Sequence, residues 1–449
     1  MMEDHENQRR AIDRHVAAKP VTRWVGAAKN SDWRAYSIYT LTFLSLISAF
    51  NYLDRSILGL ALPAIKHEMH ISDTVLGLVY GSAFAIFYAT FGIPVAWLAD
   101  RGNRRKIIAF GFAFWSAMTM LTGLVVNVWQ LAATRLLMGG GEACCVPPAH
   151  SMISDLFRKN ARPLAMAIFG TSFSVAYIVF FPIAGWIINN HGWRTMFVAA
   201  GIPGIFLTVI FLLSVREPER GATEDNKRGF AKESLPGSVR FLSGSKTYLM
   251  LLLGSTFMGA NIYATSAWFP TFLVRVHGLT LLQVASSIGP FRGVLGALGI
   301  LAGGLLSDRL GRRNERWQIR VPAIGCFLLG PAEVLFLLGD RGALWMMGLA
   351  ATSLLTLMHQ APIFAAAMSV AKLRMRAVAS SVIVFFAGLV GQVVGPLLIG
   401  ALNDRLSVTY GEAAIRYSLL IVALCSIAAG ISFWIAARHF EMGMRRAIE

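Results

Sequence analysis

Residues Arg135–His150 read RLLMGGGEACCVPPAH and place two ionisable side chains inside an apolar run that extends from about Trp129 to Phe157. Arg135 and Glu142 are seven residues apart, about two helical turns, so both project from one helix face. At membrane depth each such group costs at least ~2.5–3.5 kcal/mol. Two on one face therefore predict a polar interior that receives them. A structural ion pair in a helix bundle is the alternative interpretation.

The composition of the whole chain agrees with a membrane setting for this stretch. The 449 residues are 55% hydrophobic and only 14% charged, and the mean hydropathy is +0.58. Soluble domains carry about 25% charged residues, so we predict a polytopic membrane protein. The four cysteines all fall in apolar runs without metal-ligand spacing, and we expect no metal and no cofactor.

Twelve apolar segments are long enough to cross about 30 Å of hydrocarbon. They lie at about 37–63, 74–98, 107–126, 129–156, 163–188, 194–215, 247–274, 281–307, 319–339, 343–370, 377–402 and 414–437. The predicted fold is an all-α polytopic membrane protein with twelve transmembrane helices in two six-helix bundles. Its parts are an arm (1–36), a first bundle (37–215), a linker (216–246), a second bundle (247–437) and a tail (438–449).

The positions of the basic residues predict the topology. Nearly all loop Lys and Arg residues fall in the N-terminal arm, the even-numbered loops, the linker and the tail. The other side carries only Lys66, Arg194, Arg275, Arg341, Arg405 and Arg416. By the positive-inside rule both termini are cytoplasmic. The net charge of +17 then belongs to topology and anionic lipid, and we expect no nucleic-acid partner.

One internal repeat follows spans 2 and 8. The text DRGNRR begins at Asp100 and the text DRLGRR begins at Asp308, one half of the chain apart. An aspartate at a helix end can accept hydrogen bonds from a neighbouring helix N-terminus, while the arginines reach carboxylates or headgroups. We predict a gating latch from Asp100, Arg101, Arg104, Asp308, Arg309 and Arg312. Ordinary basic loops are the alternative.

This duplicated loop resembles the signature of the major facilitator superfamily. Within that superfamily, Asn51-Tyr52-Leu53-Asp54-Arg55 in span 1 and Gly140-Gly141-Glu142-Ala143 in span 4 resemble the Spinster family, over about residues 48–200. The resemblance implies alternating access by a monomer in a bacterial inner membrane. It also implies proton-dependent transport of a lysophospholipid or a sphingosine-phosphate-like lipid.

Depth along each helix predicts which charges meet. At 1.5 Å per residue, Asp54 lies roughly 25 Å from the cytoplasmic entry and Arg135 roughly 9 Å from the outer edge. On a ~30 Å core these depths coincide, which predicts an Asp54–Arg135 contact when the outer gate permits it. Glu142 and Arg292 both fall near mid-membrane, in different halves, so their attraction can depend on which way the cavity faces.

These positions suggest a coupling mechanism. A carboxylate in a low-dielectric cavity holds its proton more tightly, and a nearby arginine opposes this. We predict Asp54 and Glu142 as the proton-coupling pair. The predicted substrate-binding residues, which would engage an anionic headgroup and line the cavity, are Arg55, Arg135, Arg292, Asn51, Tyr52 and His150.

Other residues and functions remain alternatives. Glu333 lies in span 9, usually peripheral in the resembled fold, and is left out of the site, while His359 is expected to be structural. A symporter of a small organic anion such as a sugar acid would use buried arginines equally well. An enzyme is not expected, because the histidines and cysteines form no nucleophile–base or metal spacing, and no phosphate-binding P-loop motif is present.

Overall fold

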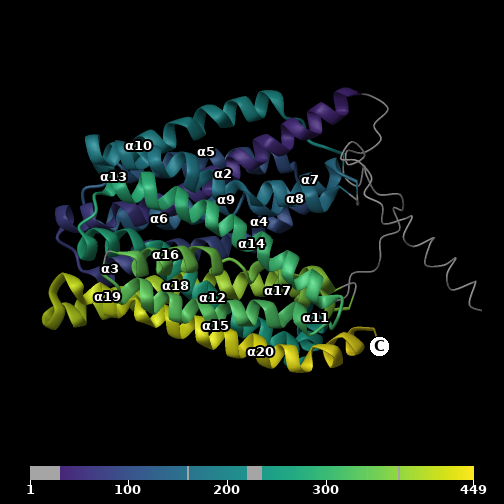
Figure 1. Cartoon of the computed structure of the whole chain (residues 1–449). Helices are drawn as coiled ribbons and strands as arrows, with labels where there is room; N and C mark the ends of the chain where they lie inside the picture. The colour runs from purple at the N-terminus through teal and green to yellow at the C-terminus, as the bar shows by residue number, and fades with distance from the viewer. Residues whose placement is uncertain (1–30, 159–160, 220–234, 341, 373–374, 449) are drawn as a thin grey trace, which may run out of the picture.

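The computed structural model describes residues 31–158, 161–219, 235–340, 342–372 and 375–448. Within these ranges every regular element is a helix, and the helices form two bundles that lie side by side (Figure 1). This arrangement confirms the predicted all-α class.

The first bundle contains the helices up to residue 214. They are α2 (Ser31–Met69), α3 (Asp73–Gly77), η2 (Leu78–Ala83), α4 (Phe84–Arg101), α5 (Arg104–Thr122), α6 (Val128–Glu142), α7 (Val146–Leu156), α8 (Arg162–Gly170), α9 (Ser172–Val175), η3 (Ala176–Phe180) and α10 (Phe181–Ser214). α10 contains two successive passages, because the backbone turns at Gly192, where φ is 80°.

The second bundle follows the charged linker. Its helices are α11 (Leu235–Ser243), α12 (Lys246–His277), α13 (Leu281–Gln283), η4 (Val284–Ile288), α14 (Gly289–Gly311), α15 (Trp317–Leu338), α16 (Ala343–Leu355), α17 (Gln360–Ser369), α18 (Arg376–Tyr410), η6 (Gly411–Ala413), α19 (Ala414–Ser418) and α20 (Leu420–Ile448). α20 continues through the predicted tail, and α11 lies within the predicted linker. Residues 1–30 of the predicted arm are outside the described residues.

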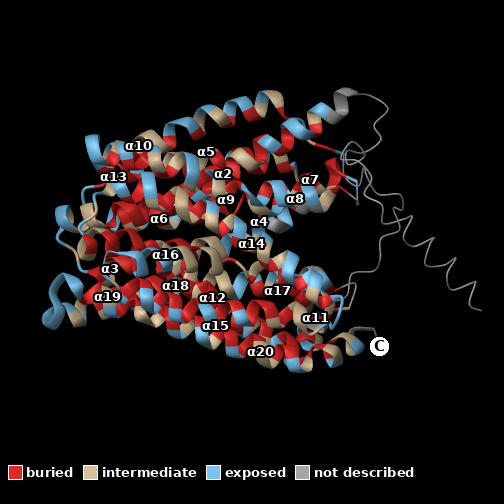
Figure 2. Ribbon diagram, viewed as in Figure 1, coloured by how far each residue is buried: buried red, intermediate tan, exposed pale blue. Residues whose placement is uncertain are grey.

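Each predicted span coincides with one helix or with consecutive helices. Six helical stretches of the described residues are long and apolar enough to cross a membrane. Two of them, Leu164–Ser214 with 51 residues and Val378–Ala447 with 70, are far longer than one crossing needs, and each covers two predicted spans. Large apolar side chains on outer faces are exposed, including Phe206, Leu213 and Leu305, and Figure 2 shows exposed residues along α10. An outward apolar surface is expected for helices that contact lipid.

The two ends of the bundles differ in charge and packing. The "basic end" is where α2 begins and α20 ends, and it carries Arg101–Lys106 and Arg309–Arg313. The "opposite end" carries α3 and α19, on the left of Figure 1.

The hydrophobic core shows that the halves are joined at the opposite end. One buried cluster combines residues from α2 to α10 with Ala264, Trp268 and Phe272 from the C-terminal part of α12. A second cluster, which includes Tyr248 and Met258 from the N-terminal part of α12, draws only on the second half. α12 therefore shares its packing with both halves near the opposite end, and with its own half near the basic end.

A close approach between the halves depends on the glycine at position 81. A Cβ added at Gly81 of η2 would lie 1.9 Å from the backbone oxygen of Gln392 in α18. No side chain fits there, so the absence of one lets η2 and α18 pack backbone against backbone.

Candidate functional site

Glu142 is at the centre of the buried charge network in the first half. α6 ends at this residue, and the next helix within the same span, α7, begins at Val146 with Pro147 in its first turn. Gly139, one turn earlier, permits α6 to lie against α4, since its Cβ would be 2.3 Å from the Phe84 oxygen. Close helix packing of this kind fixes the Glu142 carboxylate in the bundle interior, where its exposure is 0%.

Two residues of α2 bind this carboxylate. Arg55 Nε donates to Glu142 Oε2 at 2.7 Å and Asn51 Nδ2 donates to the same oxygen at 2.9 Å. Asn51 and Arg55 are four residues apart, so both point from one face of α2. Glu142 Oε1 has no hydrogen-bond partner. Oε2 is therefore hydrogen-bonded and Oε1 is free, so a proton or a hydrogen-bond donor of the substrate can bind at Oε1.

Aromatic rings hold Arg55 from the other side. Its guanidinium carbon lies 4.8 Å from the Phe84 ring centroid and 4.9 Å from that of Tyr88. A cation over such rings is stabilised by their electron-rich faces. From the sequence, Arg55 is predicted to bind substrate, and its pairing with Glu142 is not predictable, because helical spacing alone does not say which helix an arginine faces.

Asp54 and Arg135 are buried but are not paired with each other. Asp54 lies beside Trp115 and Thr119 of α5, and its Oδ1 has no hydrogen-bond partner. Arg135 Nη1 contacts Met138 Sδ at 2.8 Å, and its Nε has no partner. No ion pair within 4 Å joins Asp54 to Arg135 among the described residues. The predicted contact is therefore not formed in this structure, although the two charges act on each other.

Arg292 lies in the second half, away from Glu142. Its guanidinium carbon is 3.8 Å from the Phe269 ring centroid. The charged group that acts on it is Glu333, and the described residues show no ion pair between Arg292 and Glu142. The predicted Glu142–Arg292 attraction is thus absent as a contact in this arrangement of the halves.

Arg292 lines a cavity between the two halves. The cavity has about 740 Å³ of space between atoms, part of it open to solvent. Its walls come from α2, η3 and neighbouring segments of the first half and from α12, α14 and α16 of the second half. Most wall side chains are apolar, four of them aromatic (Phe173, Tyr177, Phe181 and Phe269), and among the described residues of the wall Arg292 alone is charged. Ser56 joins this wall and directly follows Arg55, so the cavity adjoins the charge network.

The remaining predicted substrate residues lie at the margin. The Tyr52 ring packs edge-on against Phe173, with centroids 5.6 Å apart, so it reaches the aromatic cavity wall. His150 is exposed, and its ring lies 5.3 Å from that of Phe169. His359 is buried and its Nδ1 is 3.0 Å from the Thr356 oxygen. Glu333, which the sequence placed outside the site, is buried and is hydrogen-bonded to Asn261 and Ser426.

At the basic end the two loop repeats behave differently. Arg104 is buried and forms ion pairs with Asp155 of α7 and with Glu217, the latter at 2.6 Å, all within the first half. Arg101 stacks on Trp97 at 4.1 Å. Asp308, Arg309 and Arg312 are exposed, and no ion pair between them and the first half is found in the described residues. The side chain of Asp100 is outside the described part.

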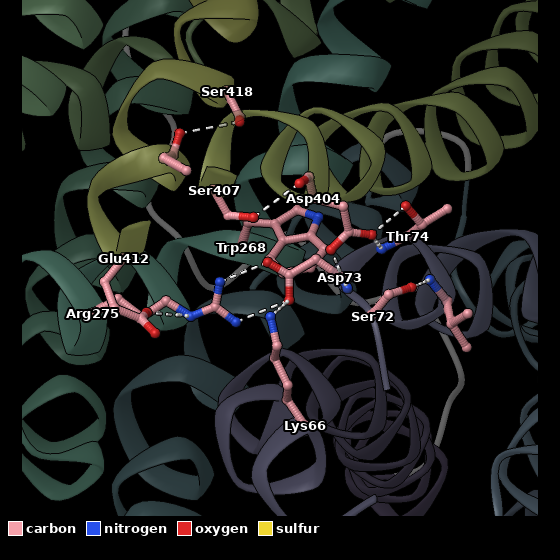
Figure 3. Close-up of polar contacts among 12 residues, drawn as sticks. Lys66, Ser72, Asp73, Thr74, Trp268, Arg275, Asp404, Ser407, Glu412 and Ser418 are labelled. Atoms are coloured by element: carbon pink, nitrogen blue, oxygen red, sulfur yellow. Dashed lines mark hydrogen bonds and ion pairs between the residues drawn. The ribbon is translucent and has the colours of Figure 1, made fainter. Parts of the chain in front are cut away.

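The latch between the halves is at the opposite end (Figure 3). Asp73, at the start of α3, accepts from Arg275 of α12 at 2.6 and 2.9 Å and from Lys66 at 2.8 Å. Asp404 of α18 accepts from the Asp73 and Thr74 backbone N–H groups at 2.9 and 2.8 Å, so it caps α3 from the other half. We call these five residues the outer latch.

The outer latch was missed by the sequence analysis, although a signal for part of it existed. Lys66 and Arg275 were among the few cations assigned to the side away from the basic loops. A rare cation at a helix end indicates a partner, but only the structure shows that the partner of Arg275 is an aspartate from the other half.

The sequence of the chain is similar to those of known membrane transporters. Residues 44–396 match the Major Facilitator Superfamily. The chain belongs to the major facilitator superfamily. It is 32% identical to an MFS-type efflux pump of Mycolicibacterium smegmatis, over 89% of this chain and 92% of the relative. It is 28% identical to a probable galactarate/D-glucarate transporter of Bacillus subtilis, over 68% and 71% of the two chains.

The structural comparison supports the resemblance to Spinster. A bacterial homolog of the human lysosomal transporter Spinster, crystallised in an inward-facing and unoccupied conformation, superimposes with a TM-score of 0.80. The two chains are 26% identical, and the match covers 91% of this chain and 98% of that one. The predicted superfamily and the Spinster resemblance are thereby confirmed, and this membrane transporter family is not a class of enzymes.

Proposed function

We propose that the chain is a proton-coupled secondary transporter of an anionic amphiphile, of the lysophospholipid or sphingosine-phosphate type. The observation that carries this proposal is the cavity between the halves, which combines one cation, Arg292, with a mostly apolar and aromatic wall. A phosphate headgroup would bind Arg292, and an acyl chain would lie along the apolar and aromatic wall. The Spinster resemblance supports the same substrate class.

Proton coupling is assigned to Glu142 and Asp54. Glu142 is paired with Arg55 through one oxygen only, and Asp54 carries an unpartnered oxygen. Neutralising or displacing Arg55 or Arg135 changes how tightly each carboxyl group holds a proton. Substrate anion and proton are thereby linked, with Arg55 and Arg135 as the mediators.

The conformation and location follow from the same proposal. If the basic end is cytoplasmic, as the positive-inside rule indicates, the outer latch closes the external side and this structure is inward-facing. We place the protein as a monomer in a bacterial inner membrane with both termini in the cytoplasm.

A sugar acid is the second candidate substrate, because a probable galactarate/D-glucarate transporter is 28% identical to the chain. The test is uptake of labelled lysophospholipid and of labelled galactarate into proteoliposomes, using wild type and Arg292→Gln. The proposal predicts lipid uptake that Arg292→Gln reduces at least about tenfold, and no galactarate uptake. Galactarate uptake with an inert lipid would reassign the substrate to the sugar acids.

A matched control for that experiment is Arg405→Gln. Arg405 is an exposed arginine of α18 at the opposite end, and it belongs neither to the cavity lining nor to the predicted gating loops. Its replacement leaves the cavity unchanged, so wild-type lipid uptake is expected. An equal loss in both variants would attribute the effect to net charge rather than to the cavity.

A further inference from the structure

Glu333 of α15 is a buried carboxylate that the coupling scheme above does not use. It is 5% exposed and lies where α12, α15 and α20 meet. Oε1 accepts from Asn261 Nδ2 at 2.6 Å and Oε2 accepts from Ser426 Oγ at 2.8 Å. No cation within 4 Å is found among the described residues. Glu142 is bound by an arginine, whereas Glu333 is bound only by neutral groups.

The Asn261 amide has more acceptors around its nitrogen than it has hydrogens, and no donor at its oxygen. Its Nδ2 faces three acceptors: Glu333, Ser426 Oγ at 2.9 Å and the Val422 oxygen at 3.1 Å. An amide nitrogen has two hydrogens. Its Oδ1 has no partner, although Asn261 is 1% exposed. The site therefore holds an unused buried acceptor beside an acid.

These groups fit both protonation states of Glu333. The ionised carboxylate accepts from Asn261 Nδ2 and from Ser426. A protonated Glu333 becomes a donor, and rotating the Asn261 amide by half a turn presents Oδ1 to accept from it. An ionised carboxylate without a cation is costly at membrane depth, which favours the protonated state of Glu333. Because the same neighbours can bind both states, protonation does not disrupt the packing.

The groups that face Glu333 come from each helix packed around it. α12 and α20 contribute the neutral Asn261 and Ser426, and the neutral thiols of Cys326 and Cys425 lie close enough for the charge of Glu333 to act on them. Arg292 of α14 is the cation that acts on Glu333. The charge of Glu333 is therefore linked to Arg292.

The same region adjoins the cavity between the halves. Ile262, the residue after Asn261, lines the cavity, and so does Thr265, whose Oγ1 donates to the backbone carbonyl oxygen of Asn261 at 2.6 Å. We propose that Glu333 is a second proton-binding site, in the second half, that exchanges its proton with the cavity and is coupled through Arg292 to an anion bound there. An anion on Arg292 screens that cation, so proton binding at Glu333 and anion binding favour each other.

Only the anion coupling rests on the proposed function; proton binding is measured without any substrate. The test is a pH titration of purified full-length protein by infrared difference spectroscopy, which detects the C=O stretch of protonated carboxyl groups. The matched control is Asp340→Asn, since the Asp340 side chain is 93% exposed. We expect one buried carboxyl band to be lost in Glu333→Gln and kept in Asp340→Asn. An unchanged set of bands in Glu333→Gln would overturn the proposal.

A second variant covers the case in which Glu333→Gln does not fold. Asn261→Ala keeps the acid and removes a donor to its ionised form, so the carboxyl band should persist to higher pH than in wild type. A titration identical to wild type would contradict the role given to Asn261. If transport is lost while the carboxyl bands are unchanged, the result counts against the transport proposal and not against proton binding at Glu333.

Discussion

At the opposite end, Asp73 and Asp404 each bind groups from the other half, whereas at the basic end Arg104 binds Asp155 and Glu217 of its own half. Contacts between halves must break when the halves rock, and contacts within a half can persist. We therefore expect the outer latch to control the equilibrium between conformations. The ion pairs of Arg104 with Asp155 and Glu217 should instead stabilise the first bundle. Four predictions test this contrast.

The largest effect is expected at Arg104. Its side chain is 1% exposed, and replacing it in Arg104→Gln leaves Asp155 and Glu217 without their cation. Removing one partner of a buried ion pair costs about 3 kcal/mol. Thermal unfolding in detergent should therefore occur at a clearly lower temperature. Arg312→Gln in the other repeat, where the side chain is exposed, should change stability by less than about 0.5 kcal/mol. Equal effects would contradict the contrast between the repeats.

The next effect is on the equilibrium between conformations. Arg275→Gln removes a charged, two-bond partner of Asp73 and leaves Lys66, which disfavours the closed opposite end by about 2 kcal/mol. Spin labels at the exposed positions Val126 and Val408, in a background without the native cysteines, should report longer distances by electron–electron double resonance.

The control for this variant is Arg405→Gln. Arg405 is exposed at the same end, and no ion pair to it is found in the described residues. Its distance distribution should match wild type. Unchanged distances in Arg275→Gln would show that the outer latch does not set the equilibrium.

Overpacking at Gly81 should separate the two halves at the opposite end by less than Arg275→Gln does. The added methyl group in Gly81→Ala would meet the Gln392 backbone oxygen, which cannot move as a side chain can. Overpacking of this kind costs about 1–3 kcal/mol, and moving the halves apart relieves it. The same label pair should lengthen. Gly304→Ala, where the added atom meets open space, is the control and should leave the distances unchanged.

The smallest effect is at Glu68, which joins α2 to Trp193 and Arg194 within the first half. Hydrogen bonds from Trp193 and Arg194 lower the pKa of Glu68. A lowered folded-state pKa contributes stability above the unfolded value of about 4.3, and that contribution is lost as the pH falls through the folded value. Because the side chain is 49% exposed, we expect under about 1 kcal/mol.

The measurement is the stability difference between wild type and Glu68→Gln near pH 7 and below pH 4. The difference should shrink at the lower pH. The label distances across the outer latch should not change, because the Glu68 contacts do not cross between halves. A difference that grows in acid would contradict the assigned pKa direction.

Much of the fold was predictable because hydropathy reports directly on membrane crossing. Helices lie at the positions of all twelve predicted spans, and Asp54, Arg135 and Glu142 are buried, as the apolar runs that contain these charges indicate. The partners of these charges were not predictable in the same way. Arg55, rather than Arg135 or Arg292, binds Glu142, because the choice depends on helix rotation, which periodicity specifies too coarsely.

Two further features could not be predicted from the sequence. Asp404 looks like an ordinary loop-proximal acid, and only the approach of α18 to α3 makes it a helix cap. Glu333 was placed outside the site from the usual position of span 9, yet Asn261 and Ser426 enclose it. In both cases the deciding partners lie at least 72 residues away along the chain.

The central claim is that Glu142 couples the proton to the substrate, and one transport comparison tests it most directly. Lysophospholipid movement is measured in proteoliposomes for wild type and Glu142→Gln, first with an imposed pH gradient and then as exchange across equal pH. Because glutamine cannot release a proton, gradient-driven uptake should fall at least about tenfold while exchange is retained. Gradient-driven uptake at the wild-type level in Glu142→Gln would contradict the account.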